Sequence, residues 1–334
     1  RARRNSDNAS YIVKLVYAGT DITDPPHRPD APMMREIDFL MRFKHPNVML
    51  GVLWEIVKDY SMASIAMPIM GGDLTSGRDK TRIPENRKQF TFERRVTIFK
   101  KVLCGLRYIH DNFVIHCDLK PENILIDESG MEVRITDFGT SVNLGASLKV
   151  ANGGDRMTQF YRPMELWSFE GLISKPEYFG RGADIYSLGL LGLWLVFDIK
   201  PLMSTVHVPF KIQGDPSLAL FNVMKMTGFK TSVIVENSDA KTTNLIKMML
   251  DIIGDPKSFW ERKAINLDLP KARNFLNFVL GMCQPKEEDR PTADKLLQSF
   301  PEGIVDHQDF EGDCLLSRIE YPETKISYTK RYTP

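Results

Sequence analysis

The pattern of apolar and polar residues divides the chain into a strand-rich first part and a helix-rich remainder. Three segments of the first part have the β-branched and aromatic composition of strands: 11–17, 48–58 and 61–68. A helix is predicted over about 31–44, because apolar residues recur there at helical spacing behind Pro32. The first part therefore predicts a small sheet with one helix.

The pattern turns helical after Gly71-Gly72. An apolar stripe that begins at Phe92 predicts a long helix ending near His110. The longest apolar run, 185–197, is too short to span a bilayer and predicts a buried helix instead. The second part is therefore expected to be an α-helical unit.

These changes of pattern predict the domain organisation. We expect a small lobe over 1–70, a large lobe over 71–302 and an extended surface tail over 303–334, with a hinge near Pro68. Residues 75–90 mix charges with Ser, Gly, Pro and Asn, which predicts an exposed loop.

Composition narrows the range of functions. The chain has 334 residues, 43% of them hydrophobic, and a formal net charge of +1, which gives no reason to expect nucleic acid or a membrane as a partner. The cysteines are widely spaced without a C-x-x-C pair, so no zinc site is indicated. A reducing, intracellular compartment, cytoplasmic or nuclear, fits this cysteine usage. Specific local chemistry must therefore carry the function.

Two motifs supply that chemistry. They read His116-Cys117-Asp118-Leu119-Lys120-Pro121-Glu122-Asn123-Ile124-Leu125-Ile126 and Asp137-Phe138-Gly139. The first differs at one position from the catalytic loop of eukaryotic serine/threonine protein kinases, and the second resembles their metal-binding motif at the usual distance. The resemblance covers about 11–302. It implies an α+β, two-lobed kinase fold with a small β-rich N-lobe and a large α-helical C-lobe.

The resemblance also implies roles for the residues of these motifs. Asp118 would accept and orient the substrate hydroxyl, and Lys120 would contact the transferring phosphate of ATP. Asn123 and Asp137 would hold Mg²⁺, a hard cation that prefers oxygen ligands. Lysine at position 120 favours Ser or Thr as the acceptor.

The small lobe of such a kinase contributes a lysine and a glutamate that pair to hold the nucleotide's phosphates. Lys14, in a diverged V-A-I-K strand, and Glu36, on the following helix, match this pair. A glycine-rich loop is expected about 15 residues before Lys14. That position lies at or before the first residue, so the N-lobe is expected to be truncated ahead of this loop.

Alignment with the family assigns the remaining nucleotide contacts. Met67 would close the back of the adenine pocket, Met70 would bond adenine through its backbone, and Asp73 would meet the ribose. Ile12 and Leu125 would enclose the adenine ring from above and below. These assignments rest on the resemblance alone.

The activation segment, 137–165, is most similar to that of the cyclin-dependent and mitogen-activated kinase group. Thr158-Gln159-Phe160-Tyr161-Arg162-Pro163-Met164-Glu165 resembles that group's T-x-W-Y-R-A-P-E, although Met164 departs from it, and 252–260 resembles the group's insert. The resemblance implies that Glu165 pairs with Arg290, that Asp184 braces the catalytic loop, and that Arg162 favours proline after the acceptor.

One departure bears on regulation. Cys117 replaces the arginine that normally receives an activation-loop phosphate, and 150–157 contains no Ser, Thr or Tyr. A kinase that does not require phosphorylation of this segment would show both features.

The sequence therefore predicts an active, ATP-dependent serine/threonine protein kinase that acts on protein substrates. A pseudokinase scaffold is the main alternative, motivated by the missing glycine-rich loop, Cys117 and Met164. A kinase of small molecules with a related fold is a further alternative. A regulatory protein partner is left open, with the tail as one docking segment.

Overall fold

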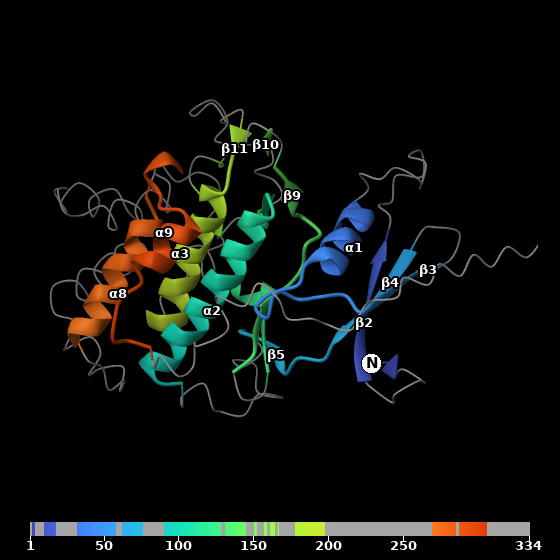
Figure 1. Cartoon of the computed structure of the whole chain (residues 1–334), viewed down its shortest axis with the longest axis horizontal. Helices are drawn as coiled ribbons and strands as arrows, with labels where there is room; N and C mark the ends of the chain where they lie inside the picture. Colours follow the sequence, from blue (N-terminus) through green and yellow to red (C-terminus); the bar gives the residue numbers. More distant parts are fainter. Residues whose placement is uncertain are drawn as a thin grey trace, which may run out of the picture.

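The structure is a computed structural model that shows a two-lobed molecule (Figure 1). The residues it describes are 2–3, 10–17, 32–57, 62–75, 90–127, 131–144, 150–151, 157–158, 161–163, 166, 178–197, 269–284 and 287–305. The small lobe is an antiparallel sheet with one helix, and the large lobe is mostly helical. This is the α+β, two-lobed arrangement that the sequence predicted, while the domain boundaries at residues 70 and 302 stay predictions.

The sheet of the small lobe has the strand order β1-β2-β4-β3. Its strands are β1 (Ala2–Arg3), β2 (Ser10–Tyr17), β4 (Met62–Pro68) and β3 (Leu53–Val57). The helix α1 (Pro32–Arg42) begins at the predicted proline and lies between the sheet and the large lobe (Figure 1). Strand β2 and helix α1 match their predictions closely, because both have a strong local pattern.

The predicted strand over 48–58 is wrong in its first half, because β3 begins only at Leu53. Residues 47–49 instead pair with β8 (Val133–Ile135) of the large lobe. The amide of Ile135 donates to the carbonyl of Asn47 at 2.9 Å, and the amide of Met49 donates to the carbonyl of Ile135 at 2.7 Å. These backbone bonds join the two lobes, and a local pattern cannot show such a distant partner.

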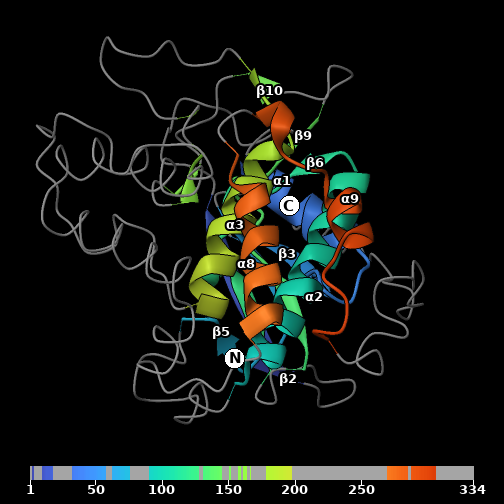
Figure 2. The same ribbon diagram turned by 90° about the vertical axis from the view of Figure 1, so that its left-hand side faces the viewer.

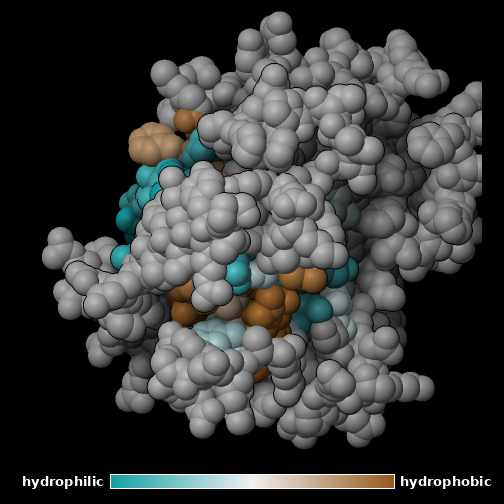
Figure 3. Space-filling model, turned by 90° about the vertical axis from the view of Figure 1, so that its right-hand side faces the viewer, coloured by the Kyte–Doolittle hydropathy of each residue, from teal (hydrophilic) through white to brown (hydrophobic). Residues whose placement is uncertain are grey.

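The outer face of the small sheet carries exposed apolar side chains. The register aligns Val13, Ala66 and Leu53 in one row across three strands. Val13 and Leu53 are exposed, as is Leu15 two residues along β2. Figure 3, which views the molecule from the side of the small lobe, shows apolar surface there.

Four helices dominate the described part of the large lobe, and they lie side by side in Figure 2. They are α2 (Phe92–Asp111), α3 (Gly182–Phe197), α8 (Leu269–Met282) and α9 (Ala293–Gln298). The side-chain oxygen of Thr91 caps α2 by accepting from the amide of Arg94 at 3.2 Å, which satisfies one unpaired donor of the first turn. Helix α3 is buried along nearly its whole length, which confirms the predicted buried helix. Of the helices described, none has both the length and the apolar character needed to cross a membrane.

Short strands and helical turns frame the segments between these helices. Strand β7 (Ile124–Ile126) pairs with both β5 (Gly72–Asp73) and β8, β6 (Val114–Ile115) pairs with β9 (Val142–Asn143), and β10 (Val150–Ala151) pairs with β11 (Tyr178–Phe179). The 3-10 turns are η3 (Pro121–Asn123) and η8 (Glu287–Asp289). Strands β6 and β7 flank the predicted catalytic loop and so fix both of its ends.

Several predictions lie outside the described residues. The described residues leave out 76–89 of the predicted exposed loop, 252–260 of the predicted insert and 306–334 of the predicted tail. They also leave out 164–165, and with them Met164 and the predicted pairing of Glu165 with Arg290.

Replacing Gly105 by alanine tests how closely α2 approaches the 47–49 segment. A Cβ atom at Gly105 would lie 2.5 Å from the backbone carbonyl oxygen of Asn47. Because backbone must move to relieve this overlap, we expect Gly105→Ala to lower the free energy of unfolding by about 1–3 kcal/mol. Chemical denaturation measures this change.

Gly281→Ala in α8 is the matched control, since a Cβ there would meet no atom within 4 Å. Alanine favours helix over glycine, so this variant should be as stable as the original or up to about 1 kcal/mol more stable. Equal stability of both variants would contradict the close approach at Gly105.

Candidate active site

A buried aspartate on α3 holds the start of the predicted catalytic loop. The carboxylate of Asp184 accepts from the amide of His116 at 2.7 Å and from the amide of Cys117 at 2.9 Å. The Nε2 atom of His110 lies 3.0 Å from the same carboxylate. Cys117 has a φ of 67°, in the left-handed region that non-glycine residues rarely adopt. The paired amide bonds secure this conformation, as expected from the resemblance.

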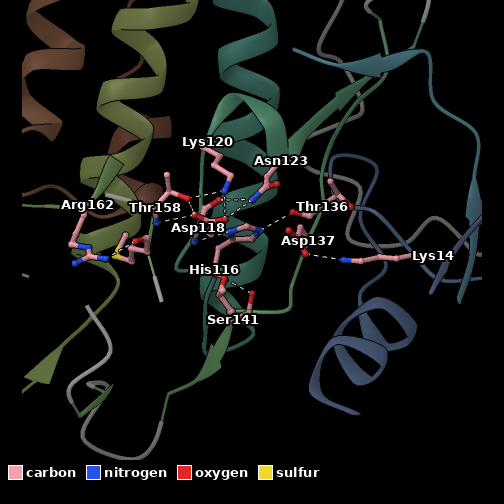
Figure 4. Close-up of polar contacts among 12 residues, drawn as sticks. Lys14, His116, Asp118, Lys120, Asn123, Thr136, Asp137, Ser141, Thr158 and Arg162 are labelled. Atoms are coloured by element: carbon pink, nitrogen blue, oxygen red, sulfur yellow. Dashed lines mark hydrogen bonds and ion pairs between the residues drawn. The ribbon is translucent and has the colours of Figure 1, made fainter. Parts of the chain in front are cut away.

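Asp118 follows directly and is surrounded by polar groups from several segments (Figure 4). Its Oδ2 atom lies 2.6 Å from the Nζ of Lys120 and accepts from the Nδ2 of Asn123 at 3.0 Å. Its Oδ1 accepts from the amide of Thr158 at 3.0 Å and from the hydroxyl of Thr158 at 2.5 Å. These donors hold both oxygens of the Asp118 carboxylate in a fixed orientation.

Thr158 is a site residue that sequence reasoning did not single out. Besides its bonds to Asp118, its hydroxyl accepts from the Nζ of Lys120 at 2.7 Å. Thr158 thus links the activation segment to both predicted catalytic residues. The only signal in the sequence was its place at the start of the run that resembles T-x-W-Y-R-A-P-E.

The predicted pair of the small lobe forms in the structure. The Nζ of Lys14 on β2 donates to Oε1 of Glu36 on α1, and it also lies 2.8 Å from Oδ1 of Asp137. Glu36 is buried, whereas the side chain of Asp137 is 44% exposed. One ammonium group therefore connects the sheet, the helix and the metal-binding motif.

The charges of Lys14, Glu36 and Asp137 shift the pKa values of Lys14 and Asp137. Burial lowers the pKa of Lys14, but attraction to Glu36 and hydrogen bonds to Asp137 and Glu36 outweigh it, so the pKa of Lys14 stands above its ordinary value. Burial would raise the pKa of Asp137, yet the hydrogen bond and the charge of Lys14 hold the pKa of Asp137 below its ordinary value. Lys14 and Asp137 are therefore both charged at neutral pH.

Phe138 fixes the direction in which Asp137 points. The Phe138 ring is fully buried, and its centroid lies 5.2 Å from those of both His116 and Phe43 and 6.1 Å from that of Phe39. Asp137 itself has a φ of 68°. With the next ring anchored between α1 and the catalytic loop, the Asp137 carboxylate faces Lys14 (Figure 4).

Most of the residues assigned to adenine and ribose lie on two sheets, and Met70 lies between β4 and β5. The register pairs Ile12 on β2 with Met67 on β4, so both share a face of the small sheet with Lys14. Asp73 on β5 pairs with Leu125 on β7 in the second sheet. Met67 and Met70 are buried. These positions agree with the assignments, while the contacts with a nucleotide stay predictions.

Asp73 is engaged locally. Its Oδ1 accepts from the amide of Thr75 at 2.7 Å and from the hydroxyl of Thr75. The predicted hydrogen bond from ribose would therefore share the Asp73 carboxylate with Thr75.

Asn123 and Asp137 fit a magnesium site. The Nδ2 of Asn123 donates to the carbonyl of Asp118 at 2.8 Å and to its carboxylate at 3.0 Å, which leaves the amide oxygen as a ligand. Asp137 supplies a partly exposed carboxylate. Among the residues described, no group of three or more His, Cys, Asp or Glu side chains could hold a metal ion. One amide oxygen and one carboxylate suit Mg²⁺, which takes few protein ligands and completes its shell with phosphate and water.

The fold and these motifs together define a protein kinase domain. A family model described as "Protein kinase domain" matches residues 1–300, and the chain belongs to this family. Members of the family use ATP with Mg²⁺. The described site residues agree with that chemistry.

Comparison with curated proteins finds relatives among cyclin-dependent and other serine/threonine kinases. The chain is 31% identical over 191 residues to CTD kinase subunit alpha of Saccharomyces cerevisiae, covering 55% of this chain and 33% of the relative. It is 30% identical over 195 residues to cyclin-dependent kinase G1 of Arabidopsis thaliana, covering 56% and 30%. It is 27% identical over 275 residues to serine/threonine-protein kinase RUNKEL of the same plant, covering 78% and 18%. The chain thus spans a third or less of the length of these relatives.

A solved structure shares the fold. The crystal structure of the yeast RNA Pol II CTD kinase CTDK-1 complex contains a chain that matches with a TM-score of 0.57 and 22% sequence identity. The match covers 89% of this chain and 86% of that one. It supports the kinase fold throughout most of the sequence.

Proposed function

We propose that this chain is an active serine/threonine protein kinase that transfers the γ-phosphate of ATP to protein hydroxyls with the help of Mg²⁺. The observation that carries the proposal is the contact of Asp118 with Lys120 and Asn123, next to Asp137, which pairs with Lys14 of the Lys14–Glu36 pair (Figure 4). Loss of one of these groups would favour the pseudokinase alternative, and all six are present.

The residues divide the reaction between them. Asp118 orients the acceptor hydroxyl and receives its proton, because Lys120 and Asn123 hold its carboxylate in place. Lys120 places a positive charge beside the acceptor, where negative charge develops on the transferring phosphate. Lys14, held by Glu36, grips the non-transferring phosphates. Mg²⁺ would neutralise phosphate charge between Asn123 and Asp137.

We propose further that the acceptor residue is followed by proline. The Nη2 of Arg162 donates to the backbone carbonyl of Met157 at 2.7 Å. This carbonyl is therefore directed toward Arg162 and does not accept from the peptide. A peptide amide at the following position would then be buried without a partner, at a cost of about 1–3 kcal/mol. Proline has no backbone N–H and avoids this penalty.

A positional peptide library tests this preference. We expect proline directly after the acceptor to be selected about tenfold or more over alanine, the factor that corresponds to the lost hydrogen bond. Arg162→Ala should reduce this selection, because the Met157 carbonyl becomes free to accept. Equal use of alanine and proline by the original protein would refute the preference and leave the kinase assignment standing.

We also propose that activity does not require phosphorylation between Asp137 and Glu165. The described parts of this segment are held by contacts that need no phosphate: Thr158 bonds Asp118, and the carbonyl of Tyr161 accepts from the Ser187 hydroxyl at 2.7 Å. Phosphatase treatment, checked by mass spectrometry, should therefore change the rate by less than about twofold. A large loss of rate together with loss of phosphate from Thr140, Ser141 or Ser147 would contradict the proposal.

We propose as well that this chain works with a regulatory protein partner, and that it is located inside the cell. One relative is named a subunit, and the solved structure with the same fold is a complex. Pull-down of the full-length protein with mass spectrometry of stoichiometric partners tests whether this chain also works in a complex.

A further inference from the structure

Strand β3 forms one edge of the small sheet. In the order β1-β2-β4-β3 it pairs with β4 on one side, and no strand among the described residues pairs with its other side (Figure 1). Along an antiparallel strand, every second residue directs both its N–H and its C=O group away from the paired neighbour. The outer edge of β3 therefore offers backbone donors and acceptors to a further strand.

The sequence of β3 does little to prevent such pairing. Edge strands of soluble proteins are usually protected by lysine, by proline or by a bulge. Strand β3 reads Leu-Trp-Glu-Ile-Val, which contains neither lysine nor proline and is rich in residues that favour strands. Its register with β4 is continuous from Leu53 to Val57, so no bulge interrupts it. This edge is therefore suited to the addition of an extended peptide.

The outer face of the sheet beside this edge is apolar, with one acidic side chain. Leu53 lies on this face and is 54% exposed. Glu55 lies two residues further along β3 and so on the same face, where it is exposed. Its neighbours in the row across the sheet are Ser64 and Leu15, and neither carries a charge. Among the described residues no basic side chain pairs with Glu55, so its charge is uncompensated.

These features define the chemistry of the occupant. It must be extended, and it should place an apolar side chain beside Leu53 and a basic side chain beside Glu55. A second copy of this chain fits less well, because antiparallel pairing of two β3 strands about Glu55 would bring two glutamates directly opposite each other. Like charges at opposite positions of a sheet are destabilising, whereas opposite charges are stabilising. A basic partner is therefore favoured over self-association.

We propose that an extended segment of a partner protein adds to β3 as a further strand, with a lysine or arginine opposite Glu55 and an apolar residue opposite Leu53. Backbone hydrogen bonds hold the segment, and these two side-chain pairs select its sequence. This inference rests on the proposed regulatory partner, to which it gives a surface and a chemistry. Binding at β3 requires no phosphoryl transfer, so it can be measured separately from kinase activity.

The first test measures binding of a fluorescent peptide, Thr-Val-Thr-Lys-Thr-Val-Thr, to the full-length protein by anisotropy. Its valines and its lysine share one face when the peptide is extended. We expect saturable binding that weakens about fivefold or more when glutamate replaces the lysine of the peptide. Glu55→Lys should reverse this preference. Asp38→Lys makes the same change of charge at another exposed position of the small lobe, on α1, and should retain the original preference.

The second test examines backbone pairing with the unaltered protein. Methyl groups on the backbone nitrogens of the threonines, or instead on those of the valines and lysine, block alternate sets of N–H groups. Only one set can face β3. One methylated peptide should therefore bind about tenfold or more weakly, while the other stays within about threefold of the original peptide.

Three results would overturn the inference: no saturable binding, an equal effect of both methylation patterns, or an unchanged preference for lysine in Glu55→Lys. Sedimentation velocity adds a fourth, since a dimer of the original protein that dissociates in Leu53→Ser would show that a second copy occupies β3. None of these results bears on catalysis. A protein that binds the peptide as expected but transfers no phosphate would refute the kinase proposal alone.

Discussion

Asp118→Asn is expected to reduce phosphoryl transfer by about 10²–10⁴-fold, the usual contribution of a general base, while ATP affinity changes by less than about twofold. The carboxylate accepts from Thr158 and Asn123 and pairs with Lys120, and none of these contacts belongs to the nucleotide-binding pair on the small lobe. Asparagine keeps the shape but cannot take up the hydroxyl proton. Single-turnover rates and a fluorescent-nucleotide titration measure the two quantities.

Glu122→Gln is the control for this change. Glu122 is exposed and lies four residues along the same loop, so neutralising it should leave both rate and affinity within twofold. Turnover retained in Asp118→Asn would refute the assigned role. Loss of ATP affinity in the same variant would show instead that the loop had been displaced.

Asp137→Asn is expected to weaken nucleotide binding about tenfold or more in the presence of Mg²⁺ and to abolish turnover as well. It removes the carboxylate that we propose as a metal ligand and also the partner of the Lys14 ammonium at 2.8 Å. Without Mg²⁺, the difference between Asp137→Asn and the original should be much smaller, since the metal no longer contributes to affinity. Titration calorimetry with and without Mg²⁺ separates these contributions.

Asp38→Asn is the control for Asp137→Asn, because it also removes one carboxylate, here from the small lobe. Its side chain is 58% exposed and lies 3.8 Å from Arg42, one turn along α1. It should bind nucleotide like the original protein at either Mg²⁺ concentration. Equal magnesium dependence in Asp137→Asn and the original would exclude Asp137 as a metal ligand.

The sequence predicted those features of the site that are encoded locally. The spacing of Asp118, Lys120 and Asn123 lies within one loop, and the turn η3 brings the amide of Asn123 back to the Asp118 carboxylate. The pairing of Lys14 with Glu36 was reached through resemblance, since the two residues are 22 positions apart in the sequence. The helices with strong apolar stripes, α2 and α3, were predicted for the same local reason.

The features that escaped prediction depend on distant partners. Thr158 contacts Asp118 from 40 residues away, and nothing in its immediate sequence indicates this bond. Lys14 reaches Asp137 across 123 residues, in addition to its expected partner. The sequence showed that Cys117 replaces an arginine, but only the structure showed that Cys117 is fully buried in an apolar cluster that also contains Met157 and Leu166.

The position of the Phe138 ring has a consequence for inhibitors. The ring is fully buried and packs against aromatic side chains of both α1 and the catalytic loop, so it connects the small lobe to the large lobe. A compound that binds in the space now filled by the Phe138 ring must displace the ring into solvent. Exposing a buried phenylalanine side chain costs about 1.5–3 kcal/mol. Such a compound would lose roughly 10–100-fold in affinity relative to one that occupies only the adenine pocket with the same contacts. Selective inhibition of this chain is therefore better sought with compounds that leave Phe138 in place.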